Sequence, residues 1–229
     1  GSVGALPLDH SGTGLLKFES GITSIGTSTT SRAIVLQGST AGVGEIAGVI
    51  NDIDGTAITG VNQQGTGTWR LSNVANTYAG ATNFGVSASG GVLEVVKMAN
   101  GGVVSSIGTS SNASSGMVFS GGTLRYIGTG DSTDRTFTAG AAGATLDASG
   151  TGALVFSRST SASMSGTNTA RTITLTGTSN ADNRLHLTLG DNGTGATSLV
   201  KAGAGKWILS NTNTYTGGTT INGGTLVVG

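Results

Sequence analysis

Short segments in which apolar and polar residues alternate recur along the whole chain, separated by turns rich in Gly and Asn. Alternation with a period of two places successive side chains on opposite faces of a strand, so these segments predict short β-strands. Examples lie at residues 15–18, 33–36, 117–119, 154–156, 172–175 and 185–189. Many short strands with many turns are typical of a β-sandwich, a β-barrel or a β-solenoid.

Internal repetition favours the solenoid. Residues 9–14 recur at 147–152, and the Gly-x-Gly-x-Trp-x-Leu-Ser-Asn segment at 65–73 recurs at 203–211, both at the same offset along the chain. Between these anchors, residues 32–38 match 171–177 and the Asn-Thr-Tyr at 76–78 matches 213–215, and each of these offsets differs from the first by a single position. We therefore expect one β-solenoid unit over residues 1–229, with a repeat copy at 9–146 and a partial second copy at 147–229.

The two copies differ in an informative way. Apolar positions agree between the copies, as in the pairs Leu16/Leu154, Phe18/Phe156, Ile34/Ile173, Leu36/Leu175, Trp69/Trp207 and Leu71/Leu209. Charged positions change, and Lys17, Glu19 and Arg70 are replaced by Val155, Ser157 and Ile208. This predicts that the apolar residues fill the interior of a stack while the charged ones face water.

Composition narrows the classes further. The chain holds 42 Gly, 36 Thr and 27 Ser, no Cys and one Pro, and only 10% of its residues are charged. Long amphipathic helices, disulfides, cysteine-based zinc sites and collagen are excluded. A net charge of zero argues against nucleic-acid binding, and short apolar runs argue against insertion into a membrane. Because 36% of the residues are hydrophobic and the mean hydropathy is +0.13, we expect an ordered chain.

A β-solenoid needs residues that these sequences supply. Gly and Asn tolerate the backbone conformations of corners, and Thr suits an exposed strand. With strands spaced by about 4.8 Å and rungs of roughly 20–25 residues, we expect roughly ten rungs. The amides of Asn73, Asn76, Asn211 and Asn213 are expected to bind backbone groups at corners.

Residues 203–228 closely resemble the passenger-associated transport repeat of autotransporters, and residues 65–96 resemble a degenerate copy. The resemblance rests on a Gly-x-Gly-x-Trp-x-Leu strand, an Asn-Thr-Tyr-x-Gly segment and a closing Gly-Gly-x-Leu. The residues that carry these motifs are Trp69, Leu71, Asn73, Asn76, Tyr78, Gly80, Trp207, Leu209, Asn211, Asn213, Tyr215, Gly217, Gly224 and Leu226.

The resemblance implies a secreted, surface-exposed passenger of a Gram-negative bacterium. It also implies a right-handed, single-stranded parallel β-helix that supports secretion and folding and presents or spaces an adhesive region. Adjacent repeats of the same chain are its implied partners. The opening Gly1-Ser2 looks like a tag scar, so we interpret the chain as a fragment, whose cut ends are expected either to stack end to end or to lose order.

Isolated polar residues do not suggest catalysis. His186 alternates with leucines that lie on the other face of a predicted strand, and both His186 and His10 are expected to lie on the surface. A metal site needs three or four convergent ligands, so an isolated histidine does not indicate one. Asp52, Asp54, Asp191 and Asn192 lack the spacing of a calcium loop, so we expect them to cap turns. We expect no catalytic, cofactor or metal site.

Two alternative functions remain open. The first is a carbohydrate-active or carbohydrate-binding β-helix. Cleavage would need two facing carboxylates, and the candidates to stack on sugars are Trp69, Trp207, Tyr78 and Tyr215. An ice-binding solenoid would need regular Thr rows. Thr-x-Thr pairs do occur, but at irregular spacing, at 27/29, 136/138, 172/174/176 and 212/214.

Overall fold

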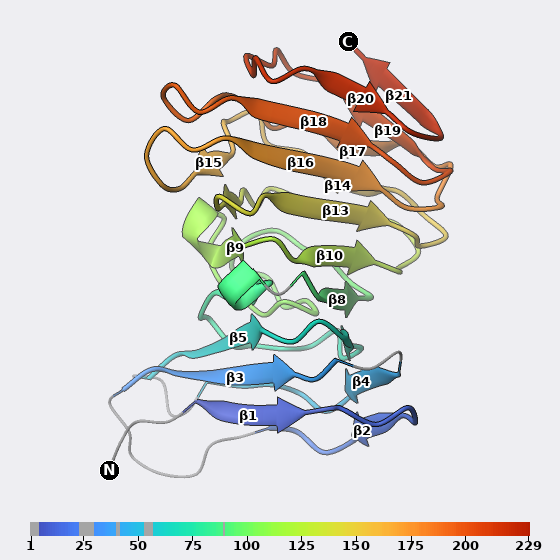
Figure 1. The fold of residues 1–229 in the computed structure, drawn as a ribbon. Helices are drawn as coiled ribbons and strands as arrows, with labels where there is room; N and C mark the ends of the chain where they lie inside the picture. Colours follow the sequence, from blue (N-terminus) through green and yellow to red (C-terminus); the bar gives the residue numbers. More distant parts are fainter. Residues whose placement is uncertain (1–4, 23–29, 40–41, 53–56, 89) are drawn as a thin grey trace.

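The computed structural model describes residues 5–22, 30–39, 42–52, 57–88 and 90–229 of the 229-residue chain. Gly1, Ser2, Thr27, Thr29 and Asp54, considered above, lie outside these ranges. The chain coils into a β-solenoid in which strands stack one above another, with the first and last strands at opposite ends (Figure 1). The expected all-β solenoid fold is therefore confirmed.

Three parallel sheets form the faces of the coil. The seven-stranded sheet contains β1 (Leu6–Asp9), β3 (Arg32–Gln37), β5 (Thr59–Gln63), β7 (Thr82–Phe84), β9 (Met117–Phe119), β12 (Thr138–Ala139) and β15 (Ser163–Met164). The nine-stranded sheet contains β2 (Leu16–Phe18), β4 (Val43–Ile46), β6 (Thr68–Leu71), β8 (Val92–Val95), β10 (Thr123–Tyr126), β13 (Ala144–Ala148), β16 (Arg171–Thr176), β18 (Thr197–Lys201) and β20 (Thr219–Ile221). The five-stranded sheet contains β11 (Asp131–Thr133), β14 (Leu154–Phe156), β17 (Asn183–Leu185), β19 (Lys206–Leu209) and β21 (Thr225–Val228).

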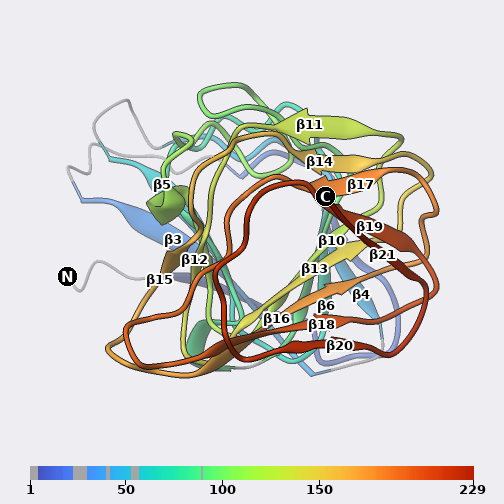
Figure 2. The same ribbon diagram turned by 90° about the horizontal axis from the view of Figure 1, so that it is seen from above.

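Two single-turn 3₁₀ helices, η1 (Val86–Ala88) and η2 (Ser114–Gly116), interrupt the strands. Figure 2 looks down the coil and shows the three sheets around a common interior. Among the described residues, no helix is long and apolar enough to cross a membrane.

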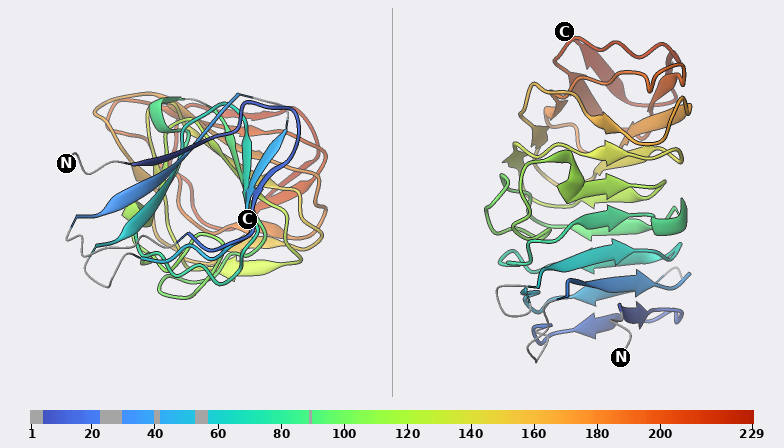
Figure 3. Two further views of the ribbon diagram at one scale, coloured as in Figure 1. Left: turned by 90° about the horizontal axis from the view of Figure 1, so that it is seen from below. Right: turned by 90° about the vertical axis from the view of Figure 1, so that its left-hand side faces the viewer.

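The coil makes about eight turns, slightly fewer than the roughly ten expected. The reason is that several turns are longer than the expected rung. Lys201 pairs with Ile221 in a short turn, whereas Leu93 pairs with Leu124 across a much longer stretch of chain. Loops outside the strands take up the difference, while the strands themselves keep their register (Figure 3).

Inward side chains from all three sheets form one core. Leu71, Leu93, Leu124, Leu146 and Leu175 are among its fully buried members. Four phenylalanines also stack along the interior, and the rings of one pair lie nearly parallel with centroids 4.4 Å apart; they are Phe84, Phe119, Phe137 and Phe156. Burial of a large apolar side chain contributes about 1.5–3 kcal/mol, so this continuous stack is the main source of stability.

The two sequence copies lie on different faces of the coil. Each strand from β1 to β8 has a counterpart between β13 and β21, and every counterpart lies one sheet further around the coil. Strands of the seven-stranded sheet correspond to strands of the nine-stranded sheet, and strands of the nine-stranded sheet to those of the five-stranded sheet. The offset between the copies therefore equals five turns plus one face, not a whole number of turns.

Candidate functional site

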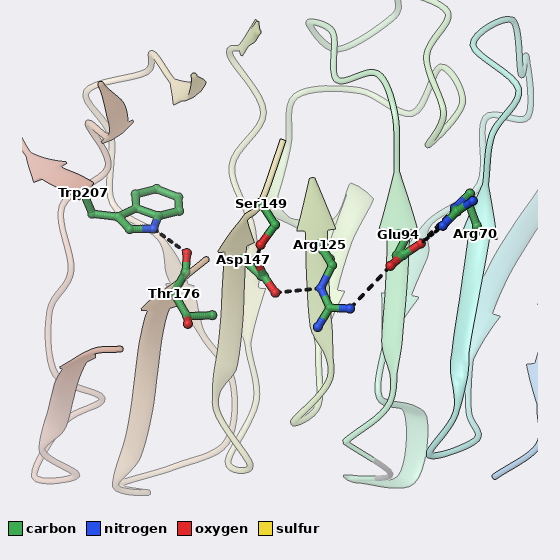
Figure 4. Close-up of polar contacts among 7 residues, drawn as sticks. All are labelled: Arg70, Glu94, Arg125, Asp147, Ser149, Thr176 and Trp207. Atoms are coloured by element: carbon green, nitrogen blue, oxygen red, sulfur yellow. Dashed lines mark hydrogen bonds and ion pairs between the residues drawn. The ribbon is translucent and has the colours of Figure 1, made fainter. Parts of the chain in front are cut away.

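The repeat-motif tryptophans make the same contact at two different corners. Trp69 on β6 and Trp207 on β19 are 1% and 0% exposed. The Nε1 of Trp69 donates to the carbonyl of Gln37 at 2.8 Å. The Nε1 of Trp207 donates to the carbonyl of Thr176, also at 2.8 Å (Figure 4). Each indole thus satisfies a carbonyl of the preceding turn, while its ring fills the interior.

The motif asparagines join consecutive turns. The Oδ1 of Asn76 accepts from the backbone N–H of Ile50 at 2.9 Å, and that of Asn213 accepts from Leu189 at 2.8 Å. Both residues also bind carbonyls through Nδ2. The other two asparagines donate to carbonyls of the preceding turn: Asn73 to Ala47 at 2.8 Å and Asn211 to His186 at 3.2 Å. The amide side chains therefore replace ladder hydrogen bonds where the strands end.

The motif tyrosines and glycines complete the network. The hydroxyl of Tyr78 lies 2.8 Å from Oγ1 of Thr82, and that of Tyr215 lies 2.7 Å from Oγ1 of Thr219. Burial raises the pKa of Tyr78. The glycines after them, Gly80 and Gly217, donate to Thr59 and Thr197 at 2.8 and 2.9 Å. A Cβ at either glycine would lie within 2.6 Å of that carbonyl oxygen, which explains the residue type.

One aspartate in each copy belongs to the same network. Asp52 accepts from the backbone N–H groups of Thr59 at 2.7 Å and Ala79 at 3.1 Å. Its counterpart Asp191 accepts from the N–H groups of Thr197 at 2.8 Å and Thr216 at 3.0 Å. Both carboxylates therefore accept hydrogen bonds from backbone groups of turns, as expected, and each also joins its own turn of the solenoid to the next one.

These contacts decide the role of the aromatic residues. Trp69, Trp207 and Tyr78 are buried, so they cannot stack on a sugar at the surface. Tyr215 is half-buried and packs against the core. The remaining motif residues Leu71 and Leu209 are buried in the core, whereas Leu226 packs on the core from the edge strand β21 and Gly224 has a φ of +65° at the preceding turn.

The outer face of the nine-stranded sheet carries a ladder of charges, which is the candidate functional site. Arg70 binds Glu94 at 2.8 Å, Arg125 binds Glu94 at 3.4 Å, and Arg125 also binds Asp147 at 2.7 Å (Figure 4). These residues pair directly in the strand register of β6, β8, β10 and β13. Parallel pairing therefore aligns four charges from turns of unequal length.

The ladder lies beside a shallow groove of about 450 Å³. Arg125 and Asp147 line it together with Ser149 and Thr178. Burial lowers the pKa of Arg125, but its hydrogen bonds with Asp147 and Glu94 outweigh this, and the net pKa is raised. Each carboxylate is 8–9% exposed and each arginine 34%, so the guanidinium groups form the outermost part of the ladder.

The ladder is poorly arranged for glycoside cleavage. Such a reaction needs two carboxyl groups facing each other across open space, one of which donates a proton. Here the guanidinium of Arg125 occupies the space between Glu94 and Asp147 and binds both. The geometry favours a neutral, ion-paired surface.

The histidines occupy different environments. His186 points outward as expected, half-buried, with Nδ1 2.8 Å from Oγ of Ser210. The expectation of a surface position is wrong for His10, which is 6% exposed and lies edge-on to the ring of Trp69. Gly42 and Gly44 occupy the intervening turn and leave room for both rings. Among the described residues, no three His, Asp or Glu side chains gather as a metal site would require.

Among the described residues, two cations that are 0% exposed, Arg135 and Lys201, escaped the sequence analysis. Arg135 is 0% exposed and donates to the carbonyls of Ala99 at 3.0 Å, Ser110 at 2.6 Å and Gly108 at 2.9 Å. It thereby ties together both limbs of the loop within the longest turn, and its burial lowers its pKa.

Lys201 occupies the inward position that Gln63 holds in the first copy. Its Nζ donates to the carbonyls of Ala202, Gly203 and Gly223 at 2.6–3.0 Å, and burial lowers its pKa. Arg135 is not recognisable locally, because its acceptors are carbonyls far away along the chain. Lys201 binds two carbonyls next to it in the sequence, but the third, Gly223, belongs to the following turn.

Comparison with known proteins identifies the chain. Residues 61–95 and 199–228 match the family model described as passenger-associated-transport-repeat. The chain is a segment of an autotransporter passenger that carries two such repeats. It is 40% identical over 231 residues to "Adhesin BmaC autotransporter" of Brucella suis biovar 1 (strain 1330), an alignment that covers 100% of this chain and 7% of that protein. No solved structure matches the chain.

Membership in this class places the segment outside the cell. Autotransporter passengers are secreted across the outer membrane and lie at the cell surface. A long, parallel, disulfide-free stack of turns is the fold that the family resemblance led us to expect for such a passenger.

Proposed function

We propose that this segment is a non-catalytic stalk section of a surface adhesin, which supports passenger secretion and folding and spaces or presents an adhesive region. The observation that carries the proposal is the shared hydrogen-bond network of Trp, Asn, Asp and Tyr, present at two corners of the coil. At both corners this network joins one turn to its neighbour, through groups that are mostly buried in the first copy and largely half-buried in the second. Such contacts stabilise stacking, and they offer no exposed reactive group.

The network suggests how the repeats support folding. In a solenoid, each turn contacts only its neighbours, so a new turn folds by adding to an existing edge. Asn76 and Asn213 satisfy the edge of the preceding turn at points where strand pairing stops. We propose that the repeats are places where addition of a turn is most favourable.

Surface display tests the proposal. The change is Asn76→Ala with Asn213→Ala in the displayed passenger, and its matched control is Thr123→Ala with Thr145→Ala on the outer face. Loss of several inter-turn hydrogen bonds costs about 1 kcal/mol each. We expect the first variant to reduce protease-resistant passenger at the cell surface about threefold or more, with the control unchanged. Equal amounts of displayed wild type, asparagine variant and threonine control would contradict the role in secretion and folding.

A second candidate function, carbohydrate binding, is favoured only by the groove that Arg125, Asp147, Ser149 and Thr178 line. Glycan-array binding by the wild-type segment that is lost in Asp147→Asn would support it. Release of reducing sugars that is lost in the same variant would overturn the non-catalytic assignment.

A further inference from the structure

The charge ladder is longer than its ion-paired part. On six successive strands of the nine-stranded sheet, the register aligns one outward charge per turn, in the order Lys17, Glu45, Arg70, Glu94, Arg125 and Asp147. The sign alternates without exception from β2 to β13. Lys17 is exposed and Glu45 half-buried, and the two arginines are 34% exposed, so both signs are present on the surface.

A second column runs beside the charges on the same face. Two positions before each charge from Glu45 onward, the register aligns β-branched residues, and the column continues onto β16; its members are Val43, Thr68, Val92, Thr123, Thr145 and Thr174. All are half-buried, so their methyl groups form a regular strip that is partly exposed to solvent. The face therefore has one column of β-branched residues and one column of charged residues.

An alternating column with an even number of members has a useful symmetry. When the column is read from Asp147 to Lys17, the charge at each position is opposite to the charge at the same position read from Lys17 to Asp147. A twofold axis perpendicular to the rod, between Arg70 and Glu94, would therefore set every charge of one copy against an opposite charge of a second copy. A parallel arrangement in the same register would set like charges against each other.

We propose that this face binds a second copy of the same chain in antiparallel orientation. Lys17 faces Asp147 of the second copy, Glu45 faces its Arg125, and Arg70 faces its Glu94. The β-branched columns meet along the same axis, so that Val43 faces Thr123 of the second copy. Such an interface is isologous, because the same patch serves both copies.

The interface of one segment is small. Six strands spaced by about 4.8 Å and two columns of side chains cover about 300 Å² per copy, well below the roughly 800 Å² per partner of a stable complex. A single segment therefore associates weakly. Rods that present several such faces, or many copies held on one surface, gain affinity through multivalency.

Cysteine cross-linking tests the orientation, because the natural chain contains no cysteine. Single-cysteine variants Val43→Cys and Thr123→Cys are mixed at high concentration and low salt under mild oxidation. Antiparallel pairing predicts disulfides between the two variants in about tenfold excess over disulfides within either variant alone. It also predicts that the excess falls at high salt, which screens exposed charges. Equal yields in all combinations, or preferential Val43→Cys homodimers, would overturn the proposal.

A charge reversal with rescue tests the pairing. Glu45→Lys in both cysteine variants creates two like-charge contacts and is expected to reduce the mixed disulfide about tenfold. The matched control is Asp182→Lys on the five-stranded side. Combining Glu45→Lys in one variant with Arg125→Glu in the other makes all six facing pairs opposite again and restores the yield. Circular dichroism confirms that each variant is folded, and a folded Glu45→Lys protein with unchanged yield would refute the proposed contact.

Discussion

At the scale of single residues, this chain uses polar side chains as substitutes for missing strand pairing. Asp52 and Asp191 each accept backbone N–H groups from two turns, and Asn76 and Asn213 bind both N–H and carbonyl groups. Arg135 does the same for carbonyls of a long loop. A buried backbone group without a partner is costly, so corners of a solenoid need such residues wherever the ladder stops.

The pH dependence of stability tests the aspartate contact. Hydrogen bonds from the Thr197 backbone, followed by those from Thr216, hold the pKa of Asp191 below its usual range. A lowered pKa in the folded state contributes stability above the unfolded pKa of about 3.9, and that stability is lost as the pH falls through the folded value. We expect Asp191→Asn to be less stable than wild type at pH 6.

Urea unfolding at several pH values measures the free energy of unfolding of wild type and of Asp191→Asn. The difference between these two free energies should narrow below about pH 4, where the carboxylate of the wild type becomes protonated. Asp182→Asn provides a comparison, because it removes an exposed ion pair with Lys206 and no backbone hydrogen bond between turns. A difference that stays constant from pH 6 to pH 3 would show that the carboxylate charge is irrelevant to this contact.

At the scale of strands and corners, the recurring unit is a strand followed by a glycine corner. Gly38 and Gly177 follow β3 and β16, with φ values of +113° and +116°. A Cβ at either position would lie 2.0–2.1 Å from the carbonyl oxygen of the turn below. The glycine is required for two reasons, because the backbone is left-handed and the neighbouring turn is in contact.

Two alanine substitutions separate these reasons. Gly218 also has a positive φ, +83°, but nothing lies within 4 Å of a Cβ built on it. Gly218→Ala should therefore cost only the backbone strain, about 1–2 kcal/mol. Gly177→Ala adds a clash with Ala148 and should lower the free energy of unfolding by about 2 kcal/mol more. Urea denaturation measures the free energy of unfolding of both variants. Equal decreases for Gly218→Ala and Gly177→Ala would mean that contact between turns is unimportant at the Gly177 corner.

At the scale of the whole molecule, the coil is a one-dimensional stack whose strands stay aligned although its turns differ in length. Leu124, Leu146 and Leu175 occupy one inward column, although their separations along the chain are unequal. Each turn contacts mainly its two neighbours, so stability is a sum of contributions from turns and from the contacts between them. The molecule should therefore tolerate loss of a complete turn better than loss of part of one.

Two deletions test this property. Removal of residues 146–174 joins Thr145 to Leu175, which places Leu175 above Leu124 in the same column. We expect this variant to keep its β circular dichroism and, in X-ray scattering, to shorten by about 4.8 Å. Removal of only residues 146–159 brings the strands out of register and should unfold the C-terminal turns. If the shorter deletion is the better tolerated of the two, the register does not control folding.

Local sequence patterns determined the class of fold and the direction of most side chains. Alternation identified short strands, repetition identified a solenoid, and agreement between the copies identified Trp69, Trp207 and the buried leucines as interior residues. These properties are readable because they depend on neighbours along the chain and on residue type. The motif asparagines, whose amides can both donate and accept, similarly indicated hydrogen bonds at corners.

Only the tertiary structure decided which distant residues share a face. The copies turned out to be rotated by one sheet, and the charges from Lys17 to Asp147 turned out to be one ladder. The unequal lengths of the turns hide this alignment, because no constant spacing connects one charge to the next. Register is set by backbone pairing and core packing between turns, so it appears only once the chain is coiled.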